Sequence, residues 1–385
     1  MSLKLGIDAS NIRQGGGVTH LSRLLSSAVP AMHGIESVTV WSCARTLATL
    51  PDQAWLKKRS SKELESYLPT RLLWQKRMLP SELIKTGCNI LFSPGGMLPG
   101  KCPVTSVTMS QNMLPFEPAE ARLFGAMHPM RLKMSLLRIG QSRSLKSADG
   151  IIFLSDYART RLCSSLVLDT QRTALIPHGI EERFFCAPRP AREAADCSAA
   201  KPFRLLYVSI LMPYKHQLEV GRAVARLRDS GISVSVEFAG DLWGNYGKAV
   251  EKEFLRIDPH QSFLKLLGPV PFERLHALYA EADAFVFASS CENLPNILIE
   301  AMASGLPILS SNRGPMPEVL GDAGWYFDPY SATSIANAIV EAMQDPASRQ
   351  LRAKQSFEKA TQYSWSRCAS DTFSFIARVA KERGV

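Results

Sequence analysis

Short apolar runs alternate with helix-length stretches along nearly the whole chain, and this alternation starts twice. In the first half, the strand-like runs are residues 3–8, 37–41, 89–93, 103–109, 150–154 and 174–176. In the second half, they are residues 203–209, 234–239, 263–267, 284–288 and 307–310. Strands that alternate with helices form a parallel sheet flanked by helices. The pattern therefore predicts an α/β protein with two doubly wound domains.

The length of the chain agrees with two domains, because 385 residues exceed the usual size of a domain with a single hydrophobic core. Residues 183–203 contain three prolines and no sustained period, so we expect the interdomain linker there. The predicted domains are then residues 1–182 and 204–362. We expect residues 363–385 to form a helix that packs back on the first domain.

Residues 289–308 carry the pattern that points most directly to chemistry. Glu292 lies in a loop after a predicted buried strand, a helix opens near Pro295 or Asn296, and Glu300 lies about one turn inside it. A helix N-terminus offers free N–H groups to a diphosphate, and carboxylates accept hydrogen bonds from sugar hydroxyls. The alternative is that Glu292 only caps the helix and Glu300 is an exposed helix residue.

The same segment resembles a known family. It looks like the Glu-x7-Glu signature of the retaining glycosyltransferases of family 4. Seven residues separate Glu292 from Glu300, and Ala-Met-Ala-Ser-Gly-Leu-Pro-Ile follows Glu300. The resemblance continues along the chain in residues 15–17, 148–155, 175–180, 215, 238–240, 267–270 and 363–365. The version at Glu292–Asn296 is similar to that of bacterial O-antigen and exopolysaccharide enzymes.

This resemblance implies the GT-B fold, in which two Rossmann-like domains face each other across an interdomain cleft. It also implies a nucleotide-diphosphate sugar bound by the second domain and an acceptor bound by the first. Glu300 would hold the ribose, and Glu292 would hold the donor sugar together with the backbone of Asn293, Leu294, Pro295 and Asn296. Lys215 matches the family lysine that neutralises the diphosphate. Further donor contacts are implied at Ser209, Gly240 and Val270.

Two positions depart from the family pattern. Ile210 stands where an arginine is common, five residues before Lys215. In the first domain, Gln111 stands where many members have a histidine, and an amide can hydrogen bond but cannot titrate. We nevertheless place Gln111 with Glu292 and Lys215 among the candidate catalytic residues.

A glycine run, Gly15, Gly16 and Gly17, follows the first strand and opens the first helix. Such a loop suits close approach of the backbone to a phosphate or to the acceptor. A simple tight turn is the alternative. We expect an acceptor or phosphate loop here.

Charge is distributed unevenly. Residues 1–200 contain 25 Lys and Arg against 15 Asp and Glu, a net +10, whereas residues 201–385 contain 20 of each. Residues 121–148 hold six basic residues and no acidic one, interleaved with leucines and an isoleucine. This arrangement suits the surface of an anionic bilayer, and the alternative is an ordinary helix packed by its apolar face. No zinc-finger or RNA-recognition signature favours nucleic acid as the partner.

Several classes of protein are disfavoured. The eight cysteines are scattered without a Cys-x-x-Cys pair, and no Asp-x-Asp or histidine cluster accompanies the candidate site. We therefore expect neither a metal nor another cofactor.

The chain shows no secretion signal and no apolar run of about 18 residues. We expect a cytoplasmic protein, with peripheral attachment at the inner face of the plasma membrane as the further option.

The sequence thus predicts a retaining glycosyltransferase that moves a hexosyl group, with mannosyl among the candidates, to a saccharide or lipid-linked acceptor in bacterial surface polysaccharide synthesis. Two alternatives remain. A sugar-nucleotide epimerase also uses two facing nucleotide-binding domains but needs no acceptor. A catalytically weak, glycosyltransferase-like binding subunit would bind the donor without turnover.

Overall fold

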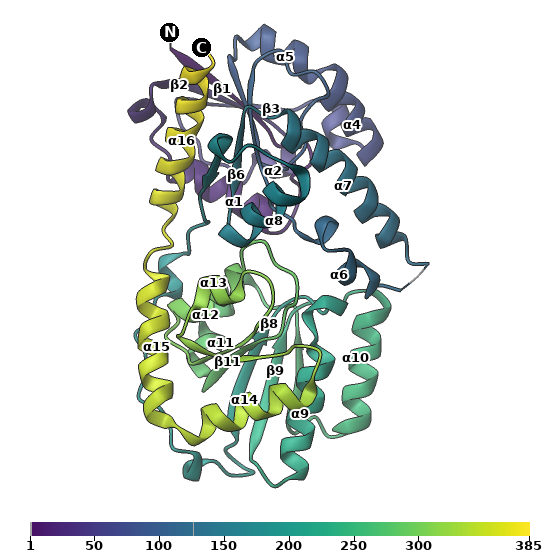
Figure 1. Cartoon of the computed structure of the whole chain (residues 1–385), viewed down its shortest axis with the longest axis vertical. Helices are drawn as coiled ribbons and strands as arrows, with labels where there is room; N and C mark the ends of the chain where they lie inside the picture. Colours follow the sequence, from purple (N-terminus) through teal and green to yellow (C-terminus); the bar gives the residue numbers. More distant parts are fainter. Residues whose placement is uncertain (1, 126) are drawn as a thin grey trace. The chain divides into compact units, whose positions relative to one another are not determined.

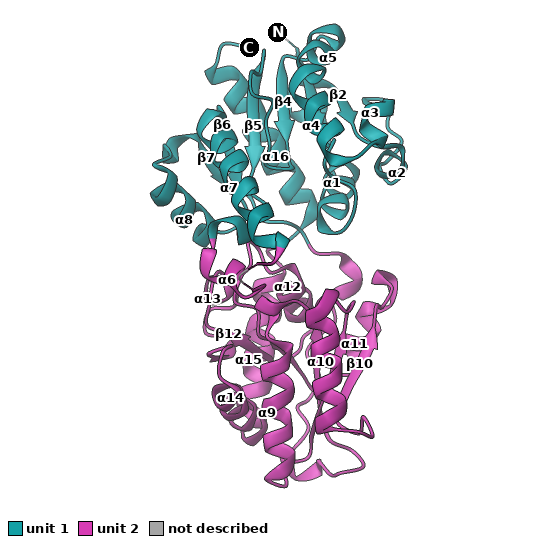
Figure 2. Cartoon of the chain, turned by 90° about the vertical axis from the view of Figure 1, so that its right-hand side faces the viewer, with its two compact units in different colours: residues 1–116, 129–179, 363–385 teal, residues 117–128, 180–362 magenta. Residues whose placement is uncertain are grey.

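The computed structural model describes residues 2–125 and 127–385, which divide into two compact units. The first unit comprises residues 1–116, 129–179 and 363–385, and the second comprises residues 117–128 and 180–362 (Figure 2). A wholly parallel sheet lies at the centre of each unit, with helices against it (Figure 1). The predicted α/β class with two doubly wound domains is confirmed.

The first sheet has seven strands in the order β3-β2-β1-β4-β5-β6-β7. The strands are β1 (Leu3–Asp8), β2 (Ile35–Trp41), β3 (Leu56–Arg59), β4 (Ile90–Ser93), β5 (Thr105–Met109), β6 (Gly150–Phe153) and β7 (Thr173–Leu175). The helices of this unit are α1 (Gly16–Ser26), α2 (Ala44–Leu47), α3 (Lys62–Glu65), α4 (Leu68–Arg77), α5 (Leu79–Thr86), α7 (Pro129–Ser147), α8 (Asp156–Leu166) and α16 (Trp365–Glu382). Five of the six residues of the central strand β1 are buried and only Lys4 is partly exposed, as expected for a strand that is covered on both faces.

The second sheet has six strands in the order β10-β9-β8-β11-β12-β13. The strands are β8 (Phe203–Val208), β9 (Val234–Ala239), β10 (Leu264–Gly268), β11 (Ala284–Phe287), β12 (Ile308–Ser311) and β13 (Gly324–Phe327). The helices are α6 (Pro118–Arg122), α9 (Gln217–Asp229), α10 (Gly244–Ile257), α11 (Leu275–Glu281), α12 (Asn296–Ala303), α13 (Met316–Leu320), α14 (Ala332–Gln344) and α15 (Pro346–Ala360). Tyr207 of β8 pairs with Phe238 of β9, so the aromatic residues of the core lie in register.

Helix α16 belongs to the first unit although it ends the chain. Gly150 at the start of β6 leaves room for it, because a Cβ added there would lie 2.8 Å from Val379 and 3.1 Å from Phe375. Beyond the helix, Arg383 forms an ion pair of 3.0 Å with Asp149. The chain therefore returns to its first sheet after completing the second.

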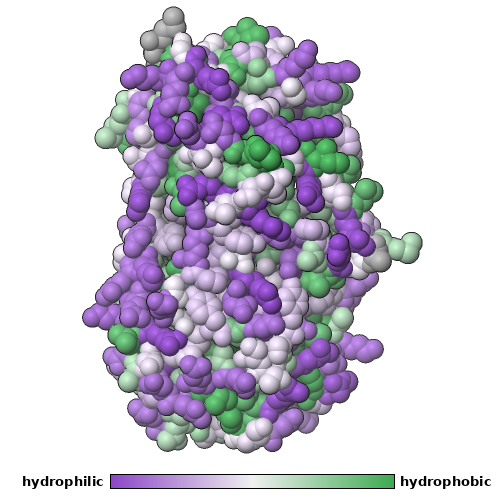
Figure 3. Space-filling view, viewed as in Figure 1, coloured by the Kyte–Doolittle hydropathy of each residue, from purple (hydrophilic) through white to green (hydrophobic). Residues whose placement is uncertain are grey.

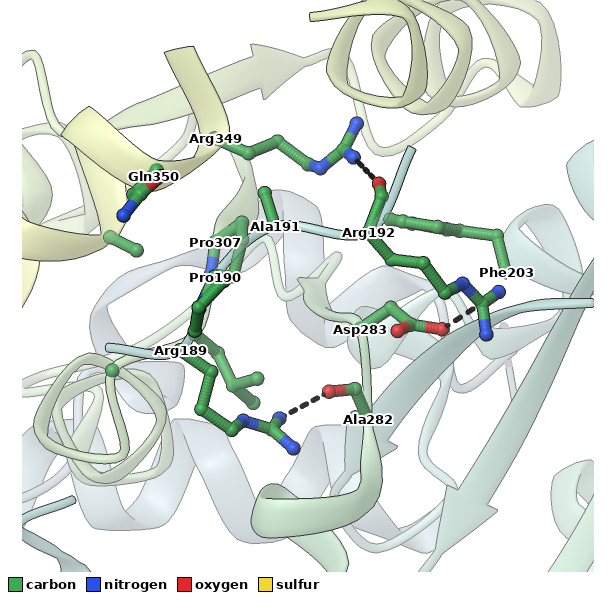
Figure 4. A pocket seen from close by; sticks show the side chains of 13 residues that line it. Arg189, Pro190, Ala191, Arg192, Phe203, Ala282, Asp283, Pro307, Arg349 and Gln350 are labelled. Atoms are coloured by element: carbon green, nitrogen blue, oxygen red, sulfur yellow. Dashed lines mark hydrogen bonds and ion pairs between the residues drawn. The ribbon is translucent and has the colours of Figure 1, made fainter. Parts of the chain in front are cut away.

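Residues 183–203 differ from the predicted linker, because they pack on the second unit. Arg189 donates hydrogen bonds to the carbonyls of Ala280 and Ala282. Figure 4 shows the bond to Ala282 and the ion pair of 3.3 Å between Arg192 and Asp283. The buried Arg349 of α15 donates to the carbonyl of Arg192. Arginine side chains thus attach this proline-containing segment to the second unit. The sequence shows the prolines and the lack of a period, but it does not show these arginine contacts.

A second correction concerns residues 117–128, which we call the strap. The sequence predicts them within the first domain, residues 1–182, but they belong to the second unit, as α6 in magenta shows in Figure 2. The strap begins after the 3-10 turn at Leu114–Phe116 and ends where α7 starts at Pro129. Its two neighbours in the sequence are both part of the first unit.

Candidate active site

Lys215 and Glu292 form an ion pair in the second unit. Lys215 ends the 3-10 turn Pro213–Lys215 after β8, and Glu292 lies in the loop after β11. Only 7% of the lysine side chain and 16% of the glutamate side chain are exposed. The ammonium group also lies 5.4 Å from the ring centres of Tyr214 and Phe287, a favourable cation–π distance. Two residues 77 positions apart in the sequence thus meet at the carboxyl ends of neighbouring strands.

Backbone contacts hold the two loops together. The amide of Ser290 donates to the carbonyl of Tyr214 at 2.9 Å, and the hydroxyl of Tyr207 donates to the carbonyl of Lys215 at 2.5 Å. His216, which follows the lysine, adopts a left-handed conformation with φ of 51°. Its Nε2 lies 2.9 Å from the Ser290 hydroxyl. The Lys215 side chain is therefore positioned by contacts on both sides of it along the chain.

Helix α12 opens directly after the Glu292 loop. Pro295 is its N-cap, and Asn293, Leu294 and Pro295 are buried in the approach to it. No acidic residue lies in the first turn, and the N-cap residue Pro295 makes no side-chain capping hydrogen bond. The first backbone N–H groups of α12 are the type of donor that a phosphate accepts from.

Glu300 lies inside α12 and is not an exposed helix residue, since only 8% of it is accessible. Burial raises its pKa from 4.5 to about 8. Its Oε2 accepts a hydrogen bond of 3.3 Å from the hydroxyl of Tyr279 in α11, which opposes that rise. A buried carboxyl with one hydrogen-bond donor retains capacity to accept bonds from a ligand. Tyr279 carried no signal in the sequence, because it reads as an ordinary core position.

The other expected donor contacts also lie after strands of this sheet. Ser209 directly follows β8 and is buried, Gly240 directly follows β9, and Val270 follows β10. A Cβ added to Gly240 would lie 2.0 Å from the carbonyl oxygen of Ser209, so only glycine fits this close approach. The loops after β8 and β9 are thereby held in contact.

Arg313 is a cation near the Glu292 loop that the sequence did not reveal. It follows β12 and precedes Gly314, where an added Cβ would lie 3.9 Å from the backbone nitrogen of Glu292. Its guanidinium group forms an ion pair of 3.3 Å with Asp328 and lies 5.7 Å from the ring centre of Tyr330. Ile210, at the position where the family commonly has arginine, is 37% exposed.

In the first unit, the glycine run and Gln111 lie beside each other. Gly15 is the N-cap of α1 with a positive φ of 68°, and a Cβ added to Gly15 or Gly16 would meet no atom within 4 Å. A Cβ on Gly17 would lie 3.6 Å from Oε1 of Gln111. These residues follow β1 and β5, so they occupy the carboxyl-end edge of the first sheet.

Two arginines near the glycine run were also missed. Arg13 and Arg71 both donate to the carbonyl of Ser66, at 3.0 and 2.9 Å. Desolvation and then the charge of Arg13 lower the pKa of Arg71. Neighbouring like charges are a signal for an anion, but these residues are 58 positions apart and no sequence pattern joins them.

The cavity drawn in Figure 4 is not part of this site. It has a volume of about 120 Å³ and is lined by Phe203, Asp283 and Pro307, which stand at the amino ends of β8, β11 and β12. Ligands of such sheets bind beyond the carboxyl ends. Within residues 2–125 and 127–385, no group of three or more His, Cys, Asp and Glu side chains could hold a metal ion.

Comparison with protein families gives a match to the second unit. Residues 193–359 match the model of the family described as glycosyl transferases group 1. The O-antigen chain mannosyltransferase B of Escherichia coli is 36% identical over 114 residues, which cover 30% of this chain and 30% of that protein. A D-inositol 3-phosphate glycosyltransferase of Pseudarthrobacter chlorophenolicus is 26% identical over 254 residues, covering 64% and 60%. The matches thus span less than two thirds of these relatives.

Solved structures are similar over nearly the whole chain. Sucrose-phosphate synthase from Thermosynechococcus elongatus superposes with a TM-score of 0.74 at 18% identity, covering 96% of this chain and 97% of that one. Anabaena HepE in complex with UDP-glucose gives a TM-score of 0.69 at 17% identity, with 99% of each chain covered. At these identities the likeness establishes the fold, which is GT-B.

Proposed function

Because residues 193–359 match the model of the glycosyl transferases group 1, we propose that this protein is a retaining glycosyltransferase using a nucleotide-diphosphate sugar. The observation that carries the proposal is the contact between Lys215 and Glu292 at the carboxyl-end edge of the second sheet, immediately before α12. In this contact, Lys215 is the cation that would bind a diphosphate, and Glu292 is the carboxylate that would accept hydrogen bonds from sugar hydroxyls.

The chemistry follows from these groups. When the bond between the sugar's anomeric carbon and the diphosphate breaks, negative charge grows on the leaving phosphate oxygen. The ammonium group of Lys215 and the N–H groups at the start of α12 stabilise that charge. An ammonium has three donors, so Lys215 can contact a phosphate while it keeps Glu292 as a partner. Glu300 accepts hydrogen bonds from the ribose.

A hexosyl donor is proposed, with mannosyl as the first candidate. The name of the Escherichia coli relative, O-antigen chain mannosyltransferase B, supports mannosyl transfer and a polysaccharide product. The complex of Anabaena HepE with UDP-glucose supports a nucleotide sugar as the donor. Retention of the anomeric configuration rests on the Glu-x7-Glu resemblance.

The acceptor is proposed to be a saccharide or lipid-linked saccharide that meets the first unit. No helix in the described part of the chain is long and apolar enough to cross a membrane. On α7, however, Leu132, Leu136 and Ile139 are 67%, 61% and 50% exposed among basic residues. In Figure 3, hydrophobic and hydrophilic atoms intermingle along the side where Figure 1 places α7. Such a surface supports peripheral binding to an anionic bilayer.

The proposal is tested by a thermal-shift screen of nucleotide sugars, including GDP-mannose and UDP-glucose. A ligand at about 100 times its Kd stabilises the folded state by about 2.7 kcal/mol, so the Tm should rise by several degrees. Lys215→Ala should abolish the rise, whereas the exposed Lys252→Ala should keep it.

Incubation of the stabilising donor with saccharide acceptors then separates the candidate activities. Transfer to an acceptor supports the proposal. An epimerised donor or free nucleoside diphosphate without acceptor would indicate an epimerase, and binding without turnover would indicate a binding subunit. A screen in which no nucleotide sugar changes the Tm would refute the proposed function.

A further inference from the structure

The strap, residues 117–128, contacts the second unit at the edge that carries the candidate donor site. Its Glu120 is 9% exposed and accepts two hydrogen bonds. Oε2 accepts from the Ser290 hydroxyl at 2.5 Å, and Oε1 accepts from the Tyr330 hydroxyl at 2.6 Å. A buried carboxylate with both oxygens bonded to hydroxyl groups is strongly fixed in position. Neither partner was expected from the sequence to be functional.

Aromatic contacts place the rest of the strap over the same edge. The ring of Phe124 lies 5.3 Å from that of Trp243 in an edge-on arrangement and 6.1 Å from that of Tyr214. His128 lies 5.6 Å from Trp243. Aromatic pairs at such distances contribute packing energy beyond simple burial. The strap is therefore attached at three of its residues.

The partners of the strap come from four different loops. Tyr214 follows β8, Trp243 follows β9, Ser290 follows β11 and Tyr330 follows β13. All four loops leave the carboxyl ends of their strands, where a ligand of this sheet type binds. One short segment thus touches most of the loops that would surround the donor.

Ser290 connects Glu120 to the Lys215–Glu292 pair. It lies two residues before Glu292, and its backbone amide donates to the carbonyl of Tyr214 at 2.9 Å, while its hydroxyl oxygen lies 3.2 Å from the same carbonyl. Its hydroxyl also contacts His216, the residue after Lys215. The hydroxyl bonded by Glu120 is therefore the one that joins the lysine loop to the glutamate loop.

We propose that Glu120 is a positioning residue of the donor site, which holds Ser290 and Tyr330 so that Lys215 and Glu292 keep the geometry needed for departure of the diphosphate. This inference rests on the proposed function. Glu120 acts through Ser290, and it makes no contact with Lys215 or Glu292 among the hydrogen bonds and ion pairs of the described residues.

The first test needs no donor. Glu120→Ala removes both hydrogen-bond acceptors, and Asp258→Ala is the matched control. Asp258 is 3% exposed and accepts from the amides of Phe263 and Leu264 at the amino end of β10. Hydrogen exchange followed by mass spectrometry should show residues 210–216 and 289–296 exchanging at least about fivefold faster in Glu120→Ala only. Unchanged exchange of both loops would overturn the proposal.

The second test is kinetic and uses the donor that the thermal-shift screen identifies. Glu120→Ala should lower kcat at least about tenfold and change the donor KM less than about threefold, because the lost geometry matters when charge develops. Glu120→Gln, which keeps one carbonyl oxygen as an acceptor, should recover part of kcat. The double variant Glu120→Ala, Ser290→Ala should lose no more than the worse single variant, because both act in one network.

The outcomes separate the two proposals. Loosened loops with kcat within about twofold of the parent would make the strap a structural brace and overturn the positioning role. An equal loss of kcat in Asp258→Ala would attribute the effect to general destabilisation and would also overturn it. If the parent neither binds UDP or GDP nor uses any donor, the proposed function fails, while the exchange experiment still decides whether Glu120 fixes the two loops.

Discussion

Burial of Glu300 is costly for folding, and this cost has a pH dependence that can be measured. The folded state raises its pKa from 4.5 to about 8 because burial disfavours the carboxylate. The side chain's contribution to stability is therefore fully present below the unfolded pKa and is lost as the pH rises through about 8. Such a cost is expected if Glu300 binds a ligand, since binding sites are rarely optimised for stability.

The first prediction uses Glu300→Gln, which cannot ionise but can still accept from Tyr279. The Tm difference in favour of this variant should grow between pH 5 and pH 8.5. Donor affinity of the parent should meanwhile rise roughly tenfold from pH 6.5 to pH 8.5, because only the carboxylate is fully competent to accept from the ribose. An intact nucleotide sugar should be used, since a terminal phosphate itself titrates near pH 6. A pH-independent affinity would contradict the assignment.

The second prediction separates the two glutamates by kinetics. Glu300 is expected to hold the ribose equally in ground and transition states, so Glu300→Gln should mainly raise the donor KM. Glu292 contacts Lys215 and is proposed to hold the sugar that changes, so Glu292→Gln should mainly lower kcat. Initial rates at varied donor concentration measure both values. If both variants stay within about twofold of the parent, less than the loss of one hydrogen bond, neither residue is in the site.

At the scale of elements, long apolar strands and their order along the chain were predictable, whereas two edge strands were not. β3 reads Leu-Lys-Lys-Arg, and only Leu56 is buried, so its three cations conceal a strand at the sheet edge. β13 is four residues long and begins with glycine.

The sequence predicts three candidate site residues, Glu292, Lys215 and Glu300, because a family resemblance spans their spacing. It does not predict Glu120 and Arg313, since their roles depend on contacts made by distant loops.

The third prediction concerns two glycines, Gly240 directly after β9 and Gly16 at the start of α1. Gly240→Ala should lower the Tm by at least about 5 °C, because its Cβ would lie 2.0 Å from the carbonyl oxygen of Ser209 and the loops would have to separate. Gly16→Ala should leave the Tm unchanged or slightly higher, since space is open there and alanine favours a helix. Thermal melts of both variants check this. A loss of transfer in the stable Gly16→Ala variant would then point to close approach of a ligand.

At the scale of the whole molecule, two expectations can be tested on the intact enzyme: activity without a metal ion, and binding of the basic first half to a bilayer. The fourth prediction is that transfer survives excess EDTA. We expect Lys215 and the N-terminus of α12 to provide the positive field that a divalent ion would otherwise supply to a diphosphate. Rates should be measured before and after chelation in buffers treated to remove metals. Complete loss of transfer, restored by adding a divalent cation, would refute this.

The fifth prediction ties the basic first half to a bilayer. The enzyme should sediment with vesicles containing anionic lipid, and binding should weaken with salt, since each cation near the surface contributes about 1 kcal/mol. Replacing Arg131, Lys133, Arg138 and Arg143 with Gln should release it from the vesicles while donor binding persists. Replacing the exposed Lys248, Lys252, Arg274 and Lys354 of the second unit with Gln removes the same charge and should leave sedimentation intact. Binding that ignores lipid charge would favour a soluble acceptor.

The path of the chain has a practical consequence for dissecting this protein. Because residues 363–385 return to the first sheet, the main part of the second unit, residues 180–362, is inserted between two segments of the first unit. Residues 117–128 are a second, shorter insertion that also belongs to the second unit. A gene fragment encoding residues 180–362 looks like a complete donor domain, yet it would omit Glu120 and Phe124 and expose the faces of Trp243 and Tyr330 that they cover. A soluble fragment therefore calls for grafting the missing twelve residues onto one terminus through a flexible tether.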